Sequence, residues 1–195
     1  MRVFFSALVL MLASLSAWAD EPQALVKGAA DKLLSQILAN KDKVDSSGDF
    51  LASLIETNLI PIVDQERMAK LALGKHWSEA TSQQQKDFID GFRGLLIRTY
   101  SGAFRAYNGQ EVTYGETRMD DTQTKAIVNS AIVQPGGTSI DIQYRLFKDE
   151  DSGQWKVFDA KVAGLGLLKT YRAQFTDQIQ RDGIEKTIAQ LKAGQ

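Results

Sequence analysis

Between Trp155 and Phe175 the chain changes its hydrophobic period, and this change constrains the fold more than any other feature of the sequence. Residues 155–162 alternate, which predicts a strand with two different faces: Phe158, Ala160 and Val162 on one, and Trp155, Val157, Asp159 and Lys161 on the other. Gly164 and Gly166 then break the strand, and apolar residues recur at helical spacing at Leu167, Leu168, Tyr171 and Phe175. A strand that bends through glycines into an amphipathic helix, with apolar residues on both sides of the bend, predicts one wall and the lid of an apolar hollow.

Residues 1–19 have the pattern of a secretory signal peptide. Arg2 precedes an apolar core over residues 3–15, and Ala17-Trp18-Ala19 fits a small-x-small cleavage site before Asp20. The apolar core is shorter than the roughly 20 residues that a membrane-spanning helix needs. We therefore expect export, cleavage near Ala19 and a mature chain of residues 20–195 that forms a single domain.

The charge and the cysteine content exclude several classes of function. The chain has 23 basic and 24 acidic residues, and only Arg2 lies in the signal, so 22 basic residues face 24 acidic ones in the mature chain. Nucleic-acid binding, which favours a concentrated basic face, is not expected. The absence of cysteine from the sequence excludes disulfides and thiolate metal sites, and we expect no metal and no cofactor. No later apolar run is long enough to span a membrane, which predicts a soluble mature protein. We also expect this protein to be a monomer.

The order of the expected elements indicates an α+β domain. Helices are expected over residues 23–40, from Asp49 to the residues before Pro61, from Asp64 to Gly74, and over 82–107 after a capping box at Thr81–Gln84, with a polar loop over 41–48. Four strands follow, at 111–115, 125–133, 138–148 and 155–162, and their short connectors imply antiparallel neighbours. Two helices, 167–179 and 184–191, end the chain. This order predicts helices packed on one side of a four-stranded antiparallel sheet.

Three glycines lie inside the longest expected helix, at Gly91, Gly94 and Gly102. Each costs about 1 kcal/mol relative to alanine in a helix interior. Each either lets another backbone approach closely, or lets the helix bend, or is a tolerated surface residue.

Four separated blocks of the sequence carry a family likeness in their order, spacing and residue types. They are PIVD to LGKHW at residues 61–77, FIDGFR to Tyr100 at 88–100, WKVFD to YRAQF at 155–175, and DGI at 182–184. Together they resemble the MlaC family of periplasmic phospholipid-binding proteins, also called toluene-tolerance auxiliary proteins, over nearly all of the mature chain. The chain departs from the family at Ala163 and Gly166, where an acidic residue and a serine are usual.

The resemblance implies both a fold and a task. The fold is a cone-like α+β domain similar to nuclear transport factor two, with a deep internal apolar pocket between a curved sheet and helices. The task is to carry phospholipid, as cargo rather than cofactor, across the periplasm of a Gram-negative bacterium. The partners that it implies are an outer-membrane lipoprotein–porin complex and the substrate-binding subunit of an inner-membrane ABC transporter, and no catalytic activity is implied.

The inward positions of the expected strands and helices are candidates for the wall of such a pocket: Leu95, Leu96, Thr99, Tyr100, Val128, Ile140, Ile142, Tyr144, Phe158, Val162, Leu167 and Tyr171. An apolar residue at any of these positions also fits an ordinary protein core. Lys169 and Arg172, three residues apart after Gly166, are candidates for contact with the lipid head group, together with the N–H groups at the start of that helix. The alternative for both cations is a solvated helix face.

Two other classes of function stay open at this point. An isomerase or hydratase of the same cone fold would need a carboxylate or histidine inside the hollow. His76 instead follows a helix stop beside Trp77, and Asp159 is expected on the strand face opposite Phe158. The other alternative is an exported chaperone or adaptor that binds protein through an apolar groove.

Overall fold

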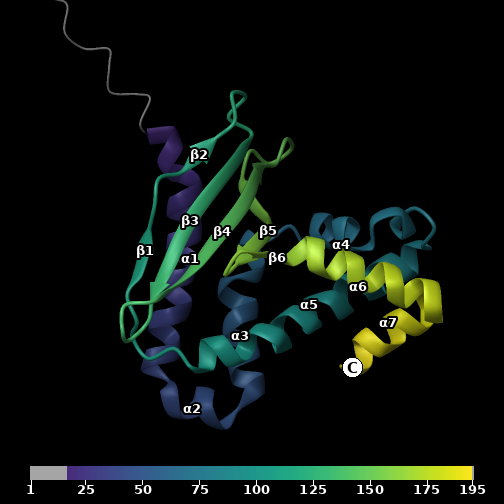
Figure 1. The fold of residues 1–195 in the computed structure, drawn as a ribbon, viewed down its shortest axis with the longest axis horizontal. Helices are drawn as coiled ribbons and strands as arrows, with labels where there is room; N and C mark the ends of the chain where they lie inside the picture. The colour runs from purple at the N-terminus through teal and green to yellow at the C-terminus, as the bar shows by residue number, and fades with distance from the viewer. Residues whose placement is uncertain (1–16, 195) are drawn as a thin grey trace, which may run out of the picture.

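The computed structural model of the chain describes residues 17–194, so most of the expected signal peptide, residues 1–16, lies outside the described residues. Figure 1 shows the described elements. The helices are α1 (Ala17–Ala39), α2 (Lys41–Ser46), α3 (Gly48–Asn58), α4 (Gln65–Leu73), α5 (Ser82–Arg105), α6 (Leu167–Asp182) and α7 (Ile184–Ala193), with the short 3-10 helices η1 (Ile60–Ile62) and η2 (Gly74–Trp77). The strands are β1 (Val112–Tyr114), β2 (Arg118–Met119), β3 (Lys125–Val133), β4 (Ser139–Lys148), β5 (Trp155–Val162) and β6 (Leu165–Gly166).

The six strands form one antiparallel sheet in the order β1-β3-β4-β5-β6, and β2 also pairs with β3. The expectation of an α+β fold with an antiparallel sheet is confirmed, but the sheet has six strands rather than four. The two additional strands, β2 and β6, have two residues each. A segment of two residues is too short to show an alternation in the sequence, so only the pairing with a neighbour identifies it as a strand.

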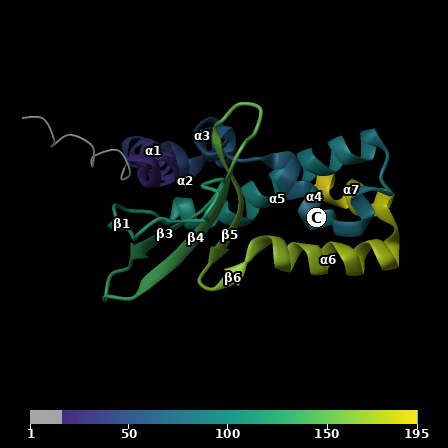
Figure 2. The ribbon, with the colours of Figure 1, turned by 90° about the horizontal axis from the view of Figure 1, so that it is seen from above.

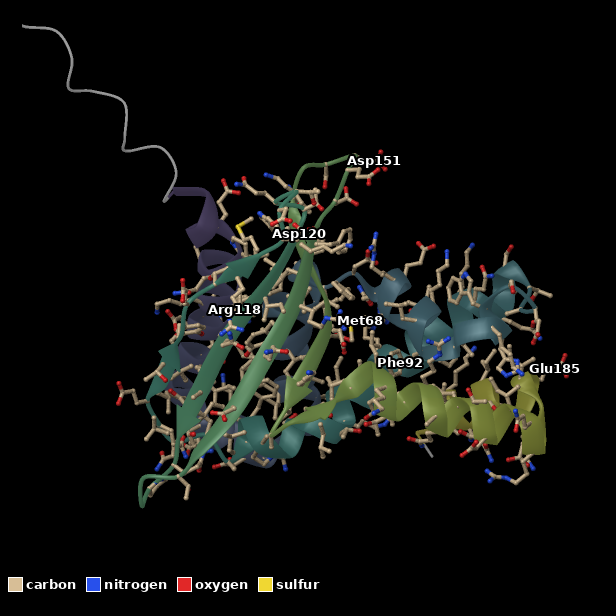
Figure 3. All side chains as sticks on the ribbon, turned by 45° about the horizontal axis from the view of Figure 1, so that its top comes forward. Met68, Phe92, Arg118, Asp120, Asp151 and Glu185 are labelled. Carbon is tan, nitrogen blue, oxygen red and sulfur yellow. The ribbon has the colours of Figure 1, made fainter. Side chains whose placement is uncertain are left out.

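Helices cover one face of the sheet and extend past one of its edges. In Figures 1 and 2, α1 and α3 lie behind β3 and β4, while α4, α6 and α7 lie beyond β5. In the described part of the chain, no helix covers the opposite face over most of β3 and β4, and Figure 3 shows Arg118 over it. We call the face that carries Val128 and Tyr144 the inner face, because Val128 packs under Val26 of α1, and we call the uncovered face the outer face.

The sequence pattern predicted that all helices pack on one side of the sheet. This prediction does not hold at the β5 edge. Arg67 of α4 stacks its guanidinium 3.5 Å from the ring centroid of Phe147. Phe147 follows Leu146, which packs on the inner face, so its own side chain points to the outer face. Because a sheet twists from strand to strand, the outer face at this edge is turned toward α4.

A β-bulge in β5 overturns the predicted faces of that strand. Between Arg145 and Leu146 the register shifts, so that Val157 pairs with Leu146 and Asp159 pairs with Arg145, which leaves Phe158 as the extra residue. Trp155 and Val157 therefore share the inner face with Ala160 and Val162, which pair with Tyr144 and Ile142. Phe158 packs instead against the helices beyond the edge of the sheet. A bulge adds one residue and inverts the alternation on one side of it, which a strict period of two cannot represent.

Capping residues bound the helices largely as the sequence predicts. The Asp64 side chain accepts a hydrogen bond from the N–H of Arg67 at the start of α4, and Gly74 ends that helix at φ 59°. Thr81 and Gln84 form the reciprocal capping box of α5. The predicted loop over residues 41–48 is wrong, because it forms α2 around the fully buried Val44, and α3 is capped by Ser47 rather than Asp49.

Most of the helical core lies beyond β5, where α4, α5, α6 and α7 meet. Its centre is aromatic: Phe92 makes edge-to-face contacts with Tyr171 and Phe175 at centroid distances of 5.2 Å and 5.5 Å. Figure 3 shows Phe92 and Met68, which both belong to this core, among the helices and away from the sheet turns at Asp120 and Asp151.

Candidate functional site

The inner face of the sheet is a filled core at one end and is incompletely covered at the other. Near the Asp120 and Asp151 turns, α1 covers it with Val26, and the indole N–H of Trp155 donates to Glu21 Oε2 at 3.3 Å. The side chains of this filled half are all buried: Ala126, Val128, Leu146, Trp155 and Val157. Val128 has an exposed fraction of 0%, so this half is ordinary protein interior.

Toward the β3–β4 turn, two rows of residues cross the same face and stay partly exposed. The strand register aligns the longer row across five strands as Tyr114, Ser130, Ile142, Val162 and Leu165, and the shorter one as Val112, Ile132 and Ile140. We call these eight residues the open half of the inner face. Ser130 alone among them is buried, and the exposed fractions reach 36% at Ile140 and 72% at Leu165. This half is apolar and lies on the covered face, yet the protein's own side chains do not fully bury it, which makes it the candidate site.

The structure divides the predicted wall residues between the sheet and the helices. Ile140, Ile142 and Val162 belong to the open half, Tyr144 is half-buried at its border, and Val128 is filled core. Five others lie in or against the helical core: Leu95, Leu96, Phe158, Leu167 and Tyr171. Thr99 is exposed on α5.

Tyr100 of α5 has Tyr171 of α6 as a neighbour. The pKa of the Tyr100 hydroxyl is raised by burial first, and then by the neighbouring Tyr171. Raised pKa values of this kind keep a phenol neutral, and a neutral phenol suits an apolar wall.

The start of α6 differs from the expectation for a phosphate site. The N–H of Leu168 donates to Asp159 Oδ1 at 3.3 Å. A carboxylate of the protein therefore already accepts the hydrogen bond that this N–H would offer to a phosphate. Asp159 is buried, and its Oδ2 lies 3.5 Å from Arg145 Nη1. The negative charge of Asp159 at this helix end disfavours a second anion.

The two cations predicted for head-group contact occupy different surroundings. Lys169 is exposed on the first turn of α6. The guanidinium of Arg172 lies over Gly74, where a Cβ atom would come within 2.7 Å of its Nε. Arg172 therefore helps to join α6 to the end of α4, and the head-group role of both residues stays a prediction.

Five residues of the open half escaped the sequence analysis: Val112, Tyr114, Ser130, Ile132 and Leu165. The sequence does hold a signal for four of them, because Val112 and Tyr114 alternate in an expected strand and Ser130 and Ile132 continue the alternation of Val128. Leu165 carries no such signal, since its strand has two residues between glycine-rich neighbours.

Two of the hollows among the described residues differ in their lining from the open half. One, of about 560 Å³, is bordered by residues of the outer face, Thr113, Asn129, Asp141, Gln143 and Lys161, and also by Tyr114, Ser130 and Ile142 of the open half. The second, of about 580 Å³, lies beside α4 and the β4–β5 turn and includes Asp64, Arg93, Asp149 and Lys156. Of the predicted wall residues, only Ile142 borders either hollow. The charged lining of the second hollow does not suit acyl chains.

Over the described residues, no helix is both long and apolar enough to cross a bilayer. Residues 17–194 also contain no group of three or more histidine, aspartate or glutamate side chains placed to hold a metal ion.

Comparison with known proteins gives one consistent family. Residues 27–193 match the profile of the MlaC protein family. The chain is 31% identical over 173 residues to the toluene tolerance protein ttg2D of Pseudomonas putida, covering 87% of this chain and 79% of that protein. It is 27% identical over 172 residues to the intermembrane phospholipid transport system binding protein MlaC of Haemophilus influenzae, covering 88% and 80%.

A solved structure agrees with these sequence matches. The phospholipid-binding protein of Ralstonia solanacearum, determined in complex with a phospholipid, superposes on this fold with a TM-score of 0.82 at 34% sequence identity. The superposition covers 89% of this chain and 96% of that one, so the two share nearly the whole domain.

Proposed function

The chain belongs to the MlaC family, and from this premise we propose that it is a phospholipid carrier of an intermembrane transport system. The observation that carries the proposal is the open half of the inner face, where apolar side chains on the helix-covered side of the sheet keep contact with solvent. A carrier needs an apolar surface that is accessible in the empty protein and that the bound lipid then covers. The phospholipid in the Ralstonia solanacearum structure, on a fold of the same kind, supports this assignment.

The site of action that we propose is the periplasm of a Gram-negative bacterium, reached after removal of the signal peptide near Ala19. There the protein takes phospholipid between an outer-membrane lipoprotein–porin complex and the substrate-binding subunit of an inner-membrane ABC transporter, as a monomer. It carries the lipid without changing it chemically and is not an enzyme.

The physical demand on such a carrier is large. Two acyl chains contain about 30 methylenes, and exposure of each to water costs about 0.8 kcal/mol, so exposing both chains costs on the order of 24 kcal/mol. A shallow surface groove leaves much of that area wet. The chains therefore need a nearly closed apolar chamber.

We place this chamber between the open half of the sheet and the helices, in a cone-like domain similar to nuclear transport factor two. The sheet contributes Ile140, Ile142, Tyr144 and Val162 to the wall, and the helical side contributes Leu95, Leu96, Thr99, Tyr100, Phe158, Leu167 and Tyr171. The partial exposure of Ile142, Val162 and Leu167 supports their placement, because a residue of a filled core has no accessible surface for a ligand to cover.

Extraction of freshly purified protein into organic solvent, followed by mass spectrometry, tests the function. Phospholipid with two acyl chains, at up to one molecule per protein, is the expected result. A lipid-free extract together with a retained peptide would instead indicate an exported chaperone or adaptor. Recovery of neither, after refolding in the presence of phospholipid vesicles, would refute the carrier.

A further inference from the structure

One hydroxyl of the open half is buried without a hydrogen bond to any of the described residues. Tyr114 Oη is shielded from solvent and has no hydrogen-bond partner within residues 17–194. A buried hydroxyl group that leaves its hydrogen bond unmade is costly, so native proteins rarely keep one without a reason. Phenylalanine would fill the same space without that cost.

Tyr114 belongs to a small group of side chains with hydroxyls on a face that is otherwise apolar. It pairs across the strands with Ser130, whose Oγ donates to Tyr144 Oη at 3.5 Å. The ring of Tyr114 packs against the filled half under α1, and Lys27 of that helix lies 5.5 Å from its centroid. The three hydroxyls therefore lie where the filled half gives way to the open half.

The Tyr114 hydroxyl is a hydrogen-bond donor under physiological conditions. Burial raises its pKa above the usual range, and the neighbouring Tyr144 and then Asp31 raise it further. Asp31 itself forms an ion pair with Lys27. A neutral phenol that is cut off from water needs an acceptor. Residues 17–194 supply none, so a ligand bound beside the sheet would have to supply it.

The chemistry of a diacyl phospholipid narrows that acceptor to one group. The acyl chains hold no polar atoms, and a phosphate carries a charge that is costly to bury beside an apolar sheet. The ester carbonyls, which join the acyl chains to the glycerol, are neutral acceptors at the head of each chain. We propose that Tyr114 donates a hydrogen bond to an ester carbonyl of the bound lipid and so positions the cargo in the chamber. This inference rests on the proposed carrier function.

A comparison of ester and ether lipids tests this positioning role. Phospholipids with the same head group and chain length, either diacyl or dialkyl, compete for delipidated protein, and mass spectrometry measures the bound ratio. The wild type is expected to prefer the diacyl lipid by about two- to tenfold, which is what one neutral hydrogen bond contributes. Tyr114→Phe is expected to bind both lipids equally.

Tyr107→Phe is the matched control, because the Tyr107 hydroxyl already donates to the carbonyl oxygen of Gln110 at 3.1 Å. It should keep the preference of the wild type. If the wild type binds both lipids without preference, or if Tyr114→Phe keeps the preference, the role of Tyr114 is overturned while the carrier function stands. If neither lipid binds to the wild type, the carrier function fails as well. Circular dichroism checks that each variant is folded, and the wild-type ratio alone decides the outcome if a variant is not.

Discussion

The division of the inner face into a filled half and an open half predicts opposite outcomes for one substitution at two valines. Val128 and Val162 lie on the same face of the sheet, but Val128 has an exposed fraction of 0% and Val162 keeps contact with solvent. Aspartate at either position replaces an apolar side chain with a charged one. Only at Val128 does the carboxylate lose all of its hydration.

The magnitudes follow from burial. Val128→Asp loses about 1.5–3 kcal/mol of transfer free energy and adds several kcal/mol for the desolvated carboxyl, a large part of the 5–15 kcal/mol that stabilises a domain. At about 2–4 °C per kcal/mol, its Tm should fall by at least about 10 °C, or the variant should not fold. Val162→Asp should lower Tm by only a few degrees, because the carboxylate stays hydrated.

Among variants that fold, the substitution at Val162 should reduce the amount of bound lipid more than the substitution at Val128. A charge at Val162 meets acyl chains in the loaded protein, so the lipid recovered by extraction should fall to about a tenth or less. Val162→Ala is the control, since it shortens the side chain without a charge and should keep most of the lipid. Equal losses of Tm at the two positions would show that the inner face is one continuous core. Full lipid content in Val162→Asp would remove this part of the sheet from the chamber wall.

Three further predictions concern the elements around the site. Gly91→Ala should lower the free energy of unfolding by about 1 kcal/mol, because a Cβ atom would lie 2.9 Å from Leu191 Cβ. Gly102→Ala, with open space around it, should raise that free energy by up to about 1 kcal/mol, and equal thermal shifts would contradict the close α5–α7 approach. Asp159→Ala should lower the free energy of unfolding by about 1–2 kcal/mol and speed amide exchange in the first turn of α6, because the Leu168 N–H loses its acceptor. Unchanged exchange there would refute a capping role for Asp159. Hydrogen bonds from the Lys125 N–H, Thr122 and Thr124 hold the pKa of Asp120 below its usual value, so the stability it adds is complete at neutral pH and lost as pH falls below about 4. The Tm difference between wild type and Asp120→Ala should shrink over that range, and a constant difference would exclude the carboxylate as its cause.

Local patterns in the sequence predicted most of the elements. The alternation over 125–133 and 155–162 matches β3 and β5, and the capping residues Asp64 and Thr81 begin α4 and α5 where predicted. These signals succeed because each depends on neighbours within a few residues. The predicted loop over 41–48 failed because α2 is stabilised by burial of Val44 against distant residues.

From the sequence, the candidate site could be predicted only as a list of apolar positions. Ile142 and Val128 have the same alternation and the same chemistry, yet Ile142 belongs to the open half and Val128 is filled core. No local pattern separates them, because the difference lies in whether α1 covers that part of the sheet. The carboxylate of Asp159 at the start of α6 was likewise unpredictable, since Asp159 and Leu168 come from different elements and meet only in the tertiary structure.

The sequence by itself therefore determined the fold class, the order of helices and strands, and the likeness to a family of lipid carriers, since all three are written in short-range periodicity, caps and residue identity. Tertiary structure alone decided which apolar residues are filled and which stay accessible, and it placed the unpartnered Tyr114 hydroxyl beside them. The physical reason is that burial depends on surfaces brought together from distant parts of the chain, and a single added residue in β5 is enough to exchange the faces of a strand.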